Sequence, residues 1–117
     1  MKKAFVMAFA LAVLPATAAT EDPEVVYLLD WVRASDCTFI RNGDSYPAPD
    51  AADHLAMKYR RARRWVDSAD DFIDRIATGS SMSGDPYQVQ CPGETRQPSA
   101  LWLTSALQAH RQPLSSN

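Results

Sequence analysis

The sequence predicts an α+β fold in which about four helices pack on a short antiparallel two-stranded sheet, with one disulfide. Four segments carry apolar residues at helical spacing. Two short segments, residues 37–41 and 87–91, alternate their side chains as strands do, and each holds one of the chain's two cysteines. Pairing of these distant segments would give the helices a frame on which to pack.

The first 19 residues have the layout of a secretory signal peptide. Lys2 and Lys3 precede an apolar run over residues 4–14, and small residues of the kind that signal peptidase recognises follow Pro15. The run is shorter than the roughly 20 apolar residues of a membrane span, which makes an uncleaved anchor the weaker alternative. We therefore expect export to the bacterial periplasm, cleavage after Ala18 or Ala19, and no integral membrane segment in the mature chain.

Cleavage would leave about 98 residues, which is enough for one domain with one core. We expect a single domain over residues 20–111 and a disordered tail over residues 112–117. All 14 acidic residues but only 10 of the 12 basic ones follow residue 19, so the mature chain carries a net charge of −4. This balance argues against nucleic-acid binding. The composition does not indicate an oligomeric state.

Cys37 and Cys91 are predicted to form a disulfide. An even number of cysteines in an exported chain favours a bridge, and with two cysteines there is one way to connect them. Two free buried thiols are the alternative.

The first half of the mature chain predicts a helix, a strand and a second helix. Proline and acidic residues open a helix over about residues 23–34. After the strand at 37–41, Asn42-Gly43 is a strong turn signal. Residues 44–49 are predicted to be a loop, because prolines disfavour helix before Asp50. Asp50 is expected to cap a helix over residues 51–66, with Asp53 as its capping-box acid.

The second half predicts two more helices around the second strand. Ser68 can cap a third helix, with Asp71 three residues on and Gly79 as its stop. A polar loop over residues 79–86 then leads into the strand at 87–91. The last helix is expected over residues 99–110.

Catalytic and metal chemistry have little support in the sequence. Asp50, Asp53 and His54 could be drawn together as metal ligands, but no usual zinc spacing is present, and we expect neither a metal nor a cofactor. The loop serines lack the motifs of serine nucleophiles. Turn hydrogen bonds are the simpler role for such hydroxyls.

A binding site for an anion is the less ordinary possibility. Arg41 ends the first strand, and His54 and Lys58 border the apolar stripe of the second helix. The serine loop precedes the partner strand, so strand pairing would bring it near Arg41. An arginine fork, an ammonium and several hydroxyls suit a carboxylate, a phosphate or an acidic peptide. The simpler alternative is that Arg41 pairs with Asp44 and that Lys58 extends its ammonium to water.

With these segments identified, the chain resembles the bacterial family known as domain of unknown function 5329. The resemblance covers about residues 24–111 and does not include the cysteines. It implies a small exported protein and supplies no activity. It rests on four motifs: Phe39-Ile40-Arg41-Asn42-Gly43, His54-Leu55 with Lys58, Ala69 with Phe72-Ile73, and Ser80-Ser81-x-Ser-Gly84-x-Pro86-Tyr87.

The motif positions coincide with the polar residues found above. The candidate ligand-binding residues are Arg41, Asn42, His54, Lys58, Ser81, Ser83 and Tyr87. Our first hypothesis is a non-enzymatic periplasmic binding or adaptor protein that recognises a small anionic ligand or a protein partner of the cell envelope. The alternatives are an envelope hydrolase using a serine of residues 80–83, with His54 or Lys58 as base, and a structural envelope protein without a ligand.

Overall fold

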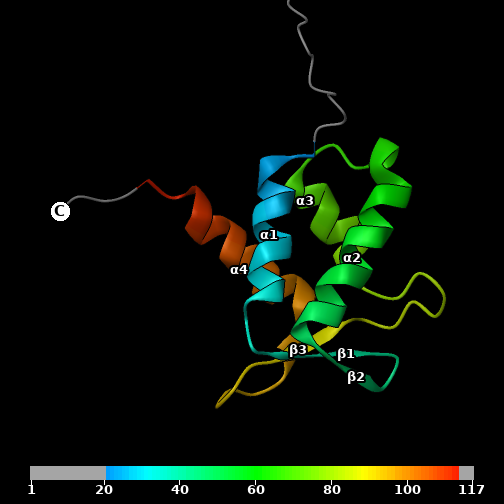
Figure 1. The fold of residues 1–117 in the computed structure, drawn as a ribbon, viewed down its shortest axis with the longest axis vertical. Coiled ribbons are helices and arrows are strands. Elements are labelled where there is room, and N and C mark those ends of the chain that lie inside the picture. Colours follow the sequence, from blue (N-terminus) through cyan, green and yellow to red (C-terminus); the bar gives the residue numbers. More distant parts are fainter. Residues whose placement is uncertain (1–20, 114–117) are drawn as a thin grey trace, which may run out of the picture.

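The computed structural model describes residues 21–113 of the chain, so the predicted signal peptide and residues 114–117 of the predicted tail lie outside the described residues. Four α-helices stand on one side of a four-stranded sheet (Figure 1). The helices are α1 (Pro23–Arg33), α2 (Ala48–Ala62), α3 (Ala69–Phe72) and α4 (Ser99–Arg111), and the strands are β1 (Thr38–Arg41), β2 (Asp44–Pro47), β3 (Gln88–Gln90) and β4 (Gln97–Pro98). The predicted α+β class with four helices is confirmed.

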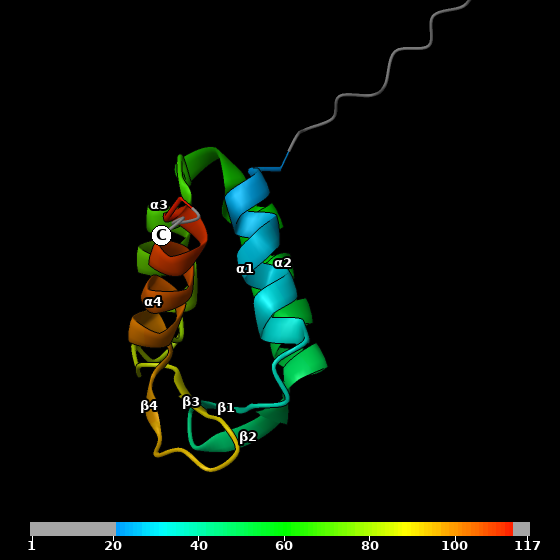
Figure 2. The ribbon, with the colours of Figure 1, turned by 90° about the vertical axis from the view of Figure 1, so that its left-hand side faces the viewer.

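The helices form two pairs above the sheet. Figure 2 shows α1 beside α2 in one pair and α3 beside α4 in the other, with the sheet lying across the lower end of both. One hydrophobic core fills the space between them, and its largest fully buried side chains are Phe72, Leu28, Leu103, Leu107, Val25, Val32 and Val89. No helix within residues 21–113 has the length and apolarity needed to cross a membrane.

The predicted pairing of the two cysteine-bearing segments is confirmed. The sheet order is β2-β1-β3-β4 with antiparallel neighbours, and Phe39 of β1 lies opposite Val89 of β3. Just before β1 and just after β3, Cys37 and Cys91 form the predicted disulfide, with their Cα atoms 4.1 Å apart. The bridge therefore joins the ends of two neighbouring strands.

The predicted two-stranded sheet was too small, because residues 44–47 form β2 rather than a loop and residues 97–98 add β4 beside β3. Asn42 and Gly43 have φ angles of 53° and 83°, which is the positive-φ pair of a tight two-residue hairpin turn. Strand β2 is an edge strand and ends at Pro47, a place where a residue without an N–H group is tolerated. The prolines that suggested a loop are thus compatible with an edge strand.

Helix α2 begins earlier than predicted, and Asp50 does not cap it. The N-cap is Pro47, without a side-chain cap bond, and Pro49 lies in the first turn. Amides of a first turn have no partner inside the helix, so proline fits there. Asp53 does not close a capping box and instead pairs with Arg33 at 2.9 Å. The helix ends at Ala62 and gives way to a 3₁₀ turn, η1 (Arg63–Trp65), short of the predicted residue 66.

The third helix begins as predicted but changes pitch. The Ser68 hydroxyl accepts a hydrogen bond from the Asp71 amide at 3.1 Å, which confirms the cap. After Phe72 the helix continues as a π-helical turn, η2 (Ile73–Ala77). Gly79 follows the helix without a left-handed conformation. Glycine is needed here because the backbone at Asp85 passes close by: a Cβ atom at position 79 would lie 2.7 Å from the Asp85 carbonyl oxygen.

Candidate functional site

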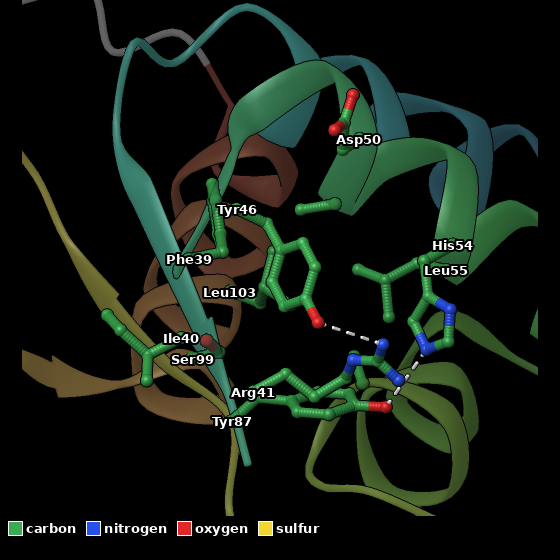
Figure 3. A pocket seen from close by; sticks show the side chains of 12 residues that line it. Phe39, Ile40, Arg41, Tyr46, Asp50, His54, Leu55, Tyr87, Ser99 and Leu103 are labelled. Atoms are coloured by element: carbon green, nitrogen blue, oxygen red, sulfur yellow. Dashed lines mark hydrogen bonds between the residues drawn. The ribbon is translucent and has the colours of Figure 1, made fainter. Parts of the chain in front are cut away.

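A pocket of about 210 Å³ lies where the helix-facing side of the sheet meets the first turns of α2 and α4 (Figure 3). Strand alternation places Phe39 and Arg41 on the same face, and hairpin register places Tyr46 opposite Phe39. The lining residues are Phe39, Ile40, Arg41, Tyr46, Asp50, Ala51, His54, Leu55, Ala77, Tyr87, Ser99 and Leu103. The pocket is thus apolar in most of its wall, with a few polar groups.

Arg41 is held against Tyr46 within this pocket. One guanidinium nitrogen donates to the Tyr46 hydroxyl at 3.2 Å, and the guanidinium carbon lies 5.0 Å from the ring centre. The expected alternative, an ion pair with Asp44, is absent, and Arg41 forms no ion pair with any residue of the described range 21–113. The guanidinium is therefore positioned by an uncharged partner and keeps its charge uncompensated.

Lys58 lies outside the pocket lining and holds Tyr87, which is part of the lining. Its ammonium donates to the carbonyl oxygens of Ile76 and Gly79, at 2.9 and 3.1 Å, and to the Tyr87 hydroxyl at 2.9 Å. These three bonds use all three N–H groups of the ammonium. Burial, followed by the charge of Arg41, lowers the pKa of Lys58. Lys58 is therefore an anchor that ties α2 to the end of η2 and to Tyr87.

Tyr87 connects this anchor to His54. The Tyr87 hydroxyl lies 3.3 Å from His54 Nε2. Since Lys58 can only donate, the Tyr87 oxygen accepts from Lys58 and its own proton is left for His54 Nε2. Burial raises the pKa of Tyr87, while burial, then Arg41 and then Lys58 lower the pKa of His54. Both shifts favour a neutral tyrosine donating to a neutral imidazole.

Replacing His54 by glutamine is expected to reduce the loss of stability on acidification. The folded protein holds the pKa of His54 below its usual value of 6.5, so the unfolded chain binds the proton more readily. The stability that this residue contributes is complete above pH 6.5 and is lost as the pH falls through the lowered pKa. Urea unfolding of wild type and His54→Gln between pH 7.5 and 5 measures the difference.

The control for this measurement is Arg61→Gln, which alters an exposed residue of the same helix outside the pocket. It should keep the wild-type dependence on pH. An equal fall in stability for wild type and His54→Gln would contradict the assignment.

The hairpin turn and the serine loop meet, as strand pairing predicted. Asn42 donates from its amide to Ser80 Oγ at 3.3 Å, and Ser83 Oγ donates to Asn42 Oδ1 at 2.6 Å. Ser80 Oγ also accepts from the amides of Met82 and Ser83. These bonds fasten the loop to the turn that follows Arg41.

The predicted site residues therefore separate into three groups. Arg41, His54 and Tyr87 line the pocket, and Lys58 holds Tyr87 in place. Asn42 and Ser83 join the turn to the loop outside the pocket, while Ser81 is exposed and lies outside the lining.

Sequence reasoning missed Tyr46 and Ser99 as lining residues. The signal for Tyr46 was present, since a two-residue turn at Asn42-Gly43 sets it opposite Phe39. Ser99 was predicted to start the last helix, and nothing in its neighbourhood indicates that pairing of β4 with β3 buries it. Asp50, predicted as a cap, lies in the pocket wall instead.

The described part of the chain contains no cluster of side chains that could bind a metal ion. Residues 21–113 contain no group of three or more histidine, cysteine, aspartate or glutamate side chains placed to hold an ion.

Comparison with known proteins supports the resemblance seen in the sequence. The model of the family of unknown function DUF5329 matches residues 19–111. An uncharacterized protein of Salmonella typhimurium strain LT2, YfeK, is 38% identical over 81 residues, which cover 66% of this chain and 68% of the relative. No solved structure matches the chain. Because the family model spans most of the chain, including every residue of the pocket, this protein belongs to the DUF5329 family.

Proposed function

We propose that this protein is a non-enzymatic binding protein of the bacterial periplasm that holds a small anion with an apolar body. The observation that carries the proposal is Arg41: its guanidinium lines a largely apolar pocket and forms no ion pair within residues 21–113. An uncompensated guanidinium in such a wall is suited to pair with a carboxylate or phosphate.

The charges around the pocket favour an anion. Burial lowers the pKa of His54 most, and the charges of Arg41 and Lys58 lower it further, because their fields oppose another positive charge. The one carboxylate of the lining, Asp50, lies at the end of the pocket away from the guanidinium of Arg41 (Figure 3). A bound anion beside Arg41 would relieve the repulsion among the bases.

The size and walls of the pocket favour a small, partly apolar ligand. An engineered apolar cavity of about 150 Å³ binds benzene. The pocket here, at about 210 Å³, has room for one ring with a charged substituent. The rings of Phe39, Tyr46 and Tyr87 offer flat surfaces for such a ring.

The hydrogen bonds favour binding over catalysis. The hydroxyls of Ser80 and Ser83 take part in the bonds of the loop and of Asn42, and no described hydrogen bond joins them to His54 or Lys58. The ammonium of Lys58 is fully engaged. A periplasmic location agrees with the signal-like first 19 residues and with the disulfide, since disulfides persist in oxidising compartments.

Benzoate is expected to bind to the wild-type protein, and Arg41→Gln is expected to weaken that binding tenfold or more. The substitution removes the charge that pairs with the carboxylate. Titration followed by ¹H–¹⁵N NMR measures the affinity and locates the site, with saturable shifts expected around residues 39–41, 46 and 54. Benzyl alcohol, which has the ring without the charge, should bind at least tenfold more weakly.

Arg61→Gln is the matched control, because Arg61 is an exposed arginine of α2 outside the pocket. Its affinity for benzoate should equal that of wild type. The proposal fails if benzoate gives no saturable shift, or if Arg41→Gln binds it as wild type does. Labelling of Ser80, Ser81 or Ser83 by a fluorophosphonate probe would instead favour the hydrolase.

A further inference from the structure

Ser99, the first residue of α4, carries a hydroxyl without a partner. The residue is 3% exposed, and its Oγ forms no hydrogen bond with any residue of the range 21–113. It is the sole buried side-chain polar atom of the described residues in this condition. Buried hydroxyls are almost always hydrogen-bonded, so an isolated one in a pocket wall calls for an explanation.

The backbone holds Ser99 firmly in that wall. Its amide donates to the Tyr87 carbonyl oxygen at 2.9 Å, and the preceding strand β4 pairs with β3. Ser99 is also the N1 residue of a 13-residue helix, and the N-cap residue, Pro98, has no hydroxyl to supply a cap. The backbone of Ser99 is therefore held in the pocket wall, and its hydroxyl does not serve as the cap of α4.

Ser99 and the basic groups lie on different sides of the pocket. In Figure 3 Ser99 lies behind β1 on the left, whereas the guanidinium of Arg41 and the ring of His54 lie on the right of the pocket. Between them lie the apolar and aromatic walls. A ligand whose anion pairs with Arg41 would turn the far side of its ring toward Ser99.

We propose that Ser99 selects for a hydroxylated aromatic carboxylate, with its Oγ hydrogen-bonded to the hydroxyl of the ligand. This inference rests on the proposed function, since it assumes that the carboxylate is held by Arg41. A hydroxyl can both donate and accept, so a ligand hydroxyl satisfies Ser99 whichever role Ser99 takes. A site with a buried polar group discriminates strongly against a ligand that leaves the group unpaired.

The test compares benzoate with 3-hydroxybenzoate and 4-hydroxybenzoate on wild type and Ser99→Ala, by the same NMR titration. We expect at least one hydroxybenzoate to bind wild type about tenfold more tightly than benzoate. Ser99→Ala should lose this preference, so that it binds the three acids with similar affinity. Ser105→Ala, at an exposed serine of the same helix, should keep it.

The outcomes distinguish a failure of this inference from a failure of the proposed function. Equal binding of all three acids to wild type, or a preference that persists in Ser99→Ala, overturns the role of Ser99 and leaves anion binding intact. Failure of all three acids to bind overturns both proposals. Thermal unfolding of Ser99→Ala confirms that the variant is folded, since removing an unpaired hydroxyl should not lower its Tm.

Discussion

Breaking the Cys37–Cys91 bridge is expected to lower the free energy of unfolding by about 4 kcal/mol. The two cysteines are separated by 54 positions in the sequence, so the bridge closes a long loop and restricts the unfolded chain strongly. Domains of this size are commonly stable by only about 5–15 kcal/mol in total, so the loss would be a large share of the stability. Urea unfolding of oxidised and reduced protein measures it.

The measurement needs a control for packing, because Cys37 is buried in the core. Reduction leaves both thiols in place, whereas the double variant Cys37→Ala/Cys91→Ala also removes the sulfur atoms. If chain entropy dominates, the reduced protein and the double variant should unfold at similar urea concentrations. An unchanged midpoint on reduction would contradict the prediction.

Replacing Lys58 by methionine is expected to lower the free energy of unfolding by about 2 kcal/mol. Methionine keeps an unbranched apolar stem but removes the ammonium, which leaves the carbonyl oxygens of Ile76 and Gly79 and the Tyr87 hydroxyl without their donor. Hydrogen bonds to a charged group contribute about 1.5–3 kcal/mol each, and water can replace part of what is lost at this half-buried site. Urea unfolding at pH 7 measures the change.

Arg61→Met is the matched control, because it removes an exposed charge from the same helix. It should change the stability by no more than about 0.5 kcal/mol. The Lys58 variant should also raise the pKa of His54, since one of the charges that lowers it is gone. Stability equal to that of Arg61→Met, together with an unchanged histidine titration, would mean that Lys58 does not anchor the pocket.

The elements with strong local signals could be predicted from the sequence. Helix α1, the Ser68 cap and the pairing of Cys37 with Cys91 depend on nearby caps, helical periodicity and a single possible disulfide. Strand β2 and the early start of α2 were missed because the prolines of residues 44–49 were taken to disrupt strands and helices. Both Pro47 and Pro49 occupy places where a missing N–H group costs nothing, namely a strand edge and a first helical turn.

The basic residues of the candidate site could be predicted from the sequence, whereas several of the residues that line the pocket could not. Arg41 was recognised as a base at a strand end, and His54 and Lys58 because bases beside an apolar stripe are unusual. The structure joins His54 and Lys58 at Tyr87 and places Arg41 in the pocket that Tyr87 lines. The role of each of these residues depends on distances in the folded protein, which the spacing of residues in the sequence does not determine. The ammonium of Lys58 donates hydrogen bonds to carbonyl groups of η2 and of the residues after it. Ser99 is buried by the two-residue strand β4 that precedes it.

The prolines at the sheet margins have a consequence for self-association. The outer strands β2 and β4 are short, and each ends in a proline, Pro47 or Pro98, that is also the N-cap of the helix that follows. A proline offers no backbone donor to a further strand, and the chain turns into a helix immediately afterwards. Another copy of the protein therefore finds little free strand edge on which to extend the sheet, which protects an otherwise open four-stranded sheet against edge-to-edge aggregation.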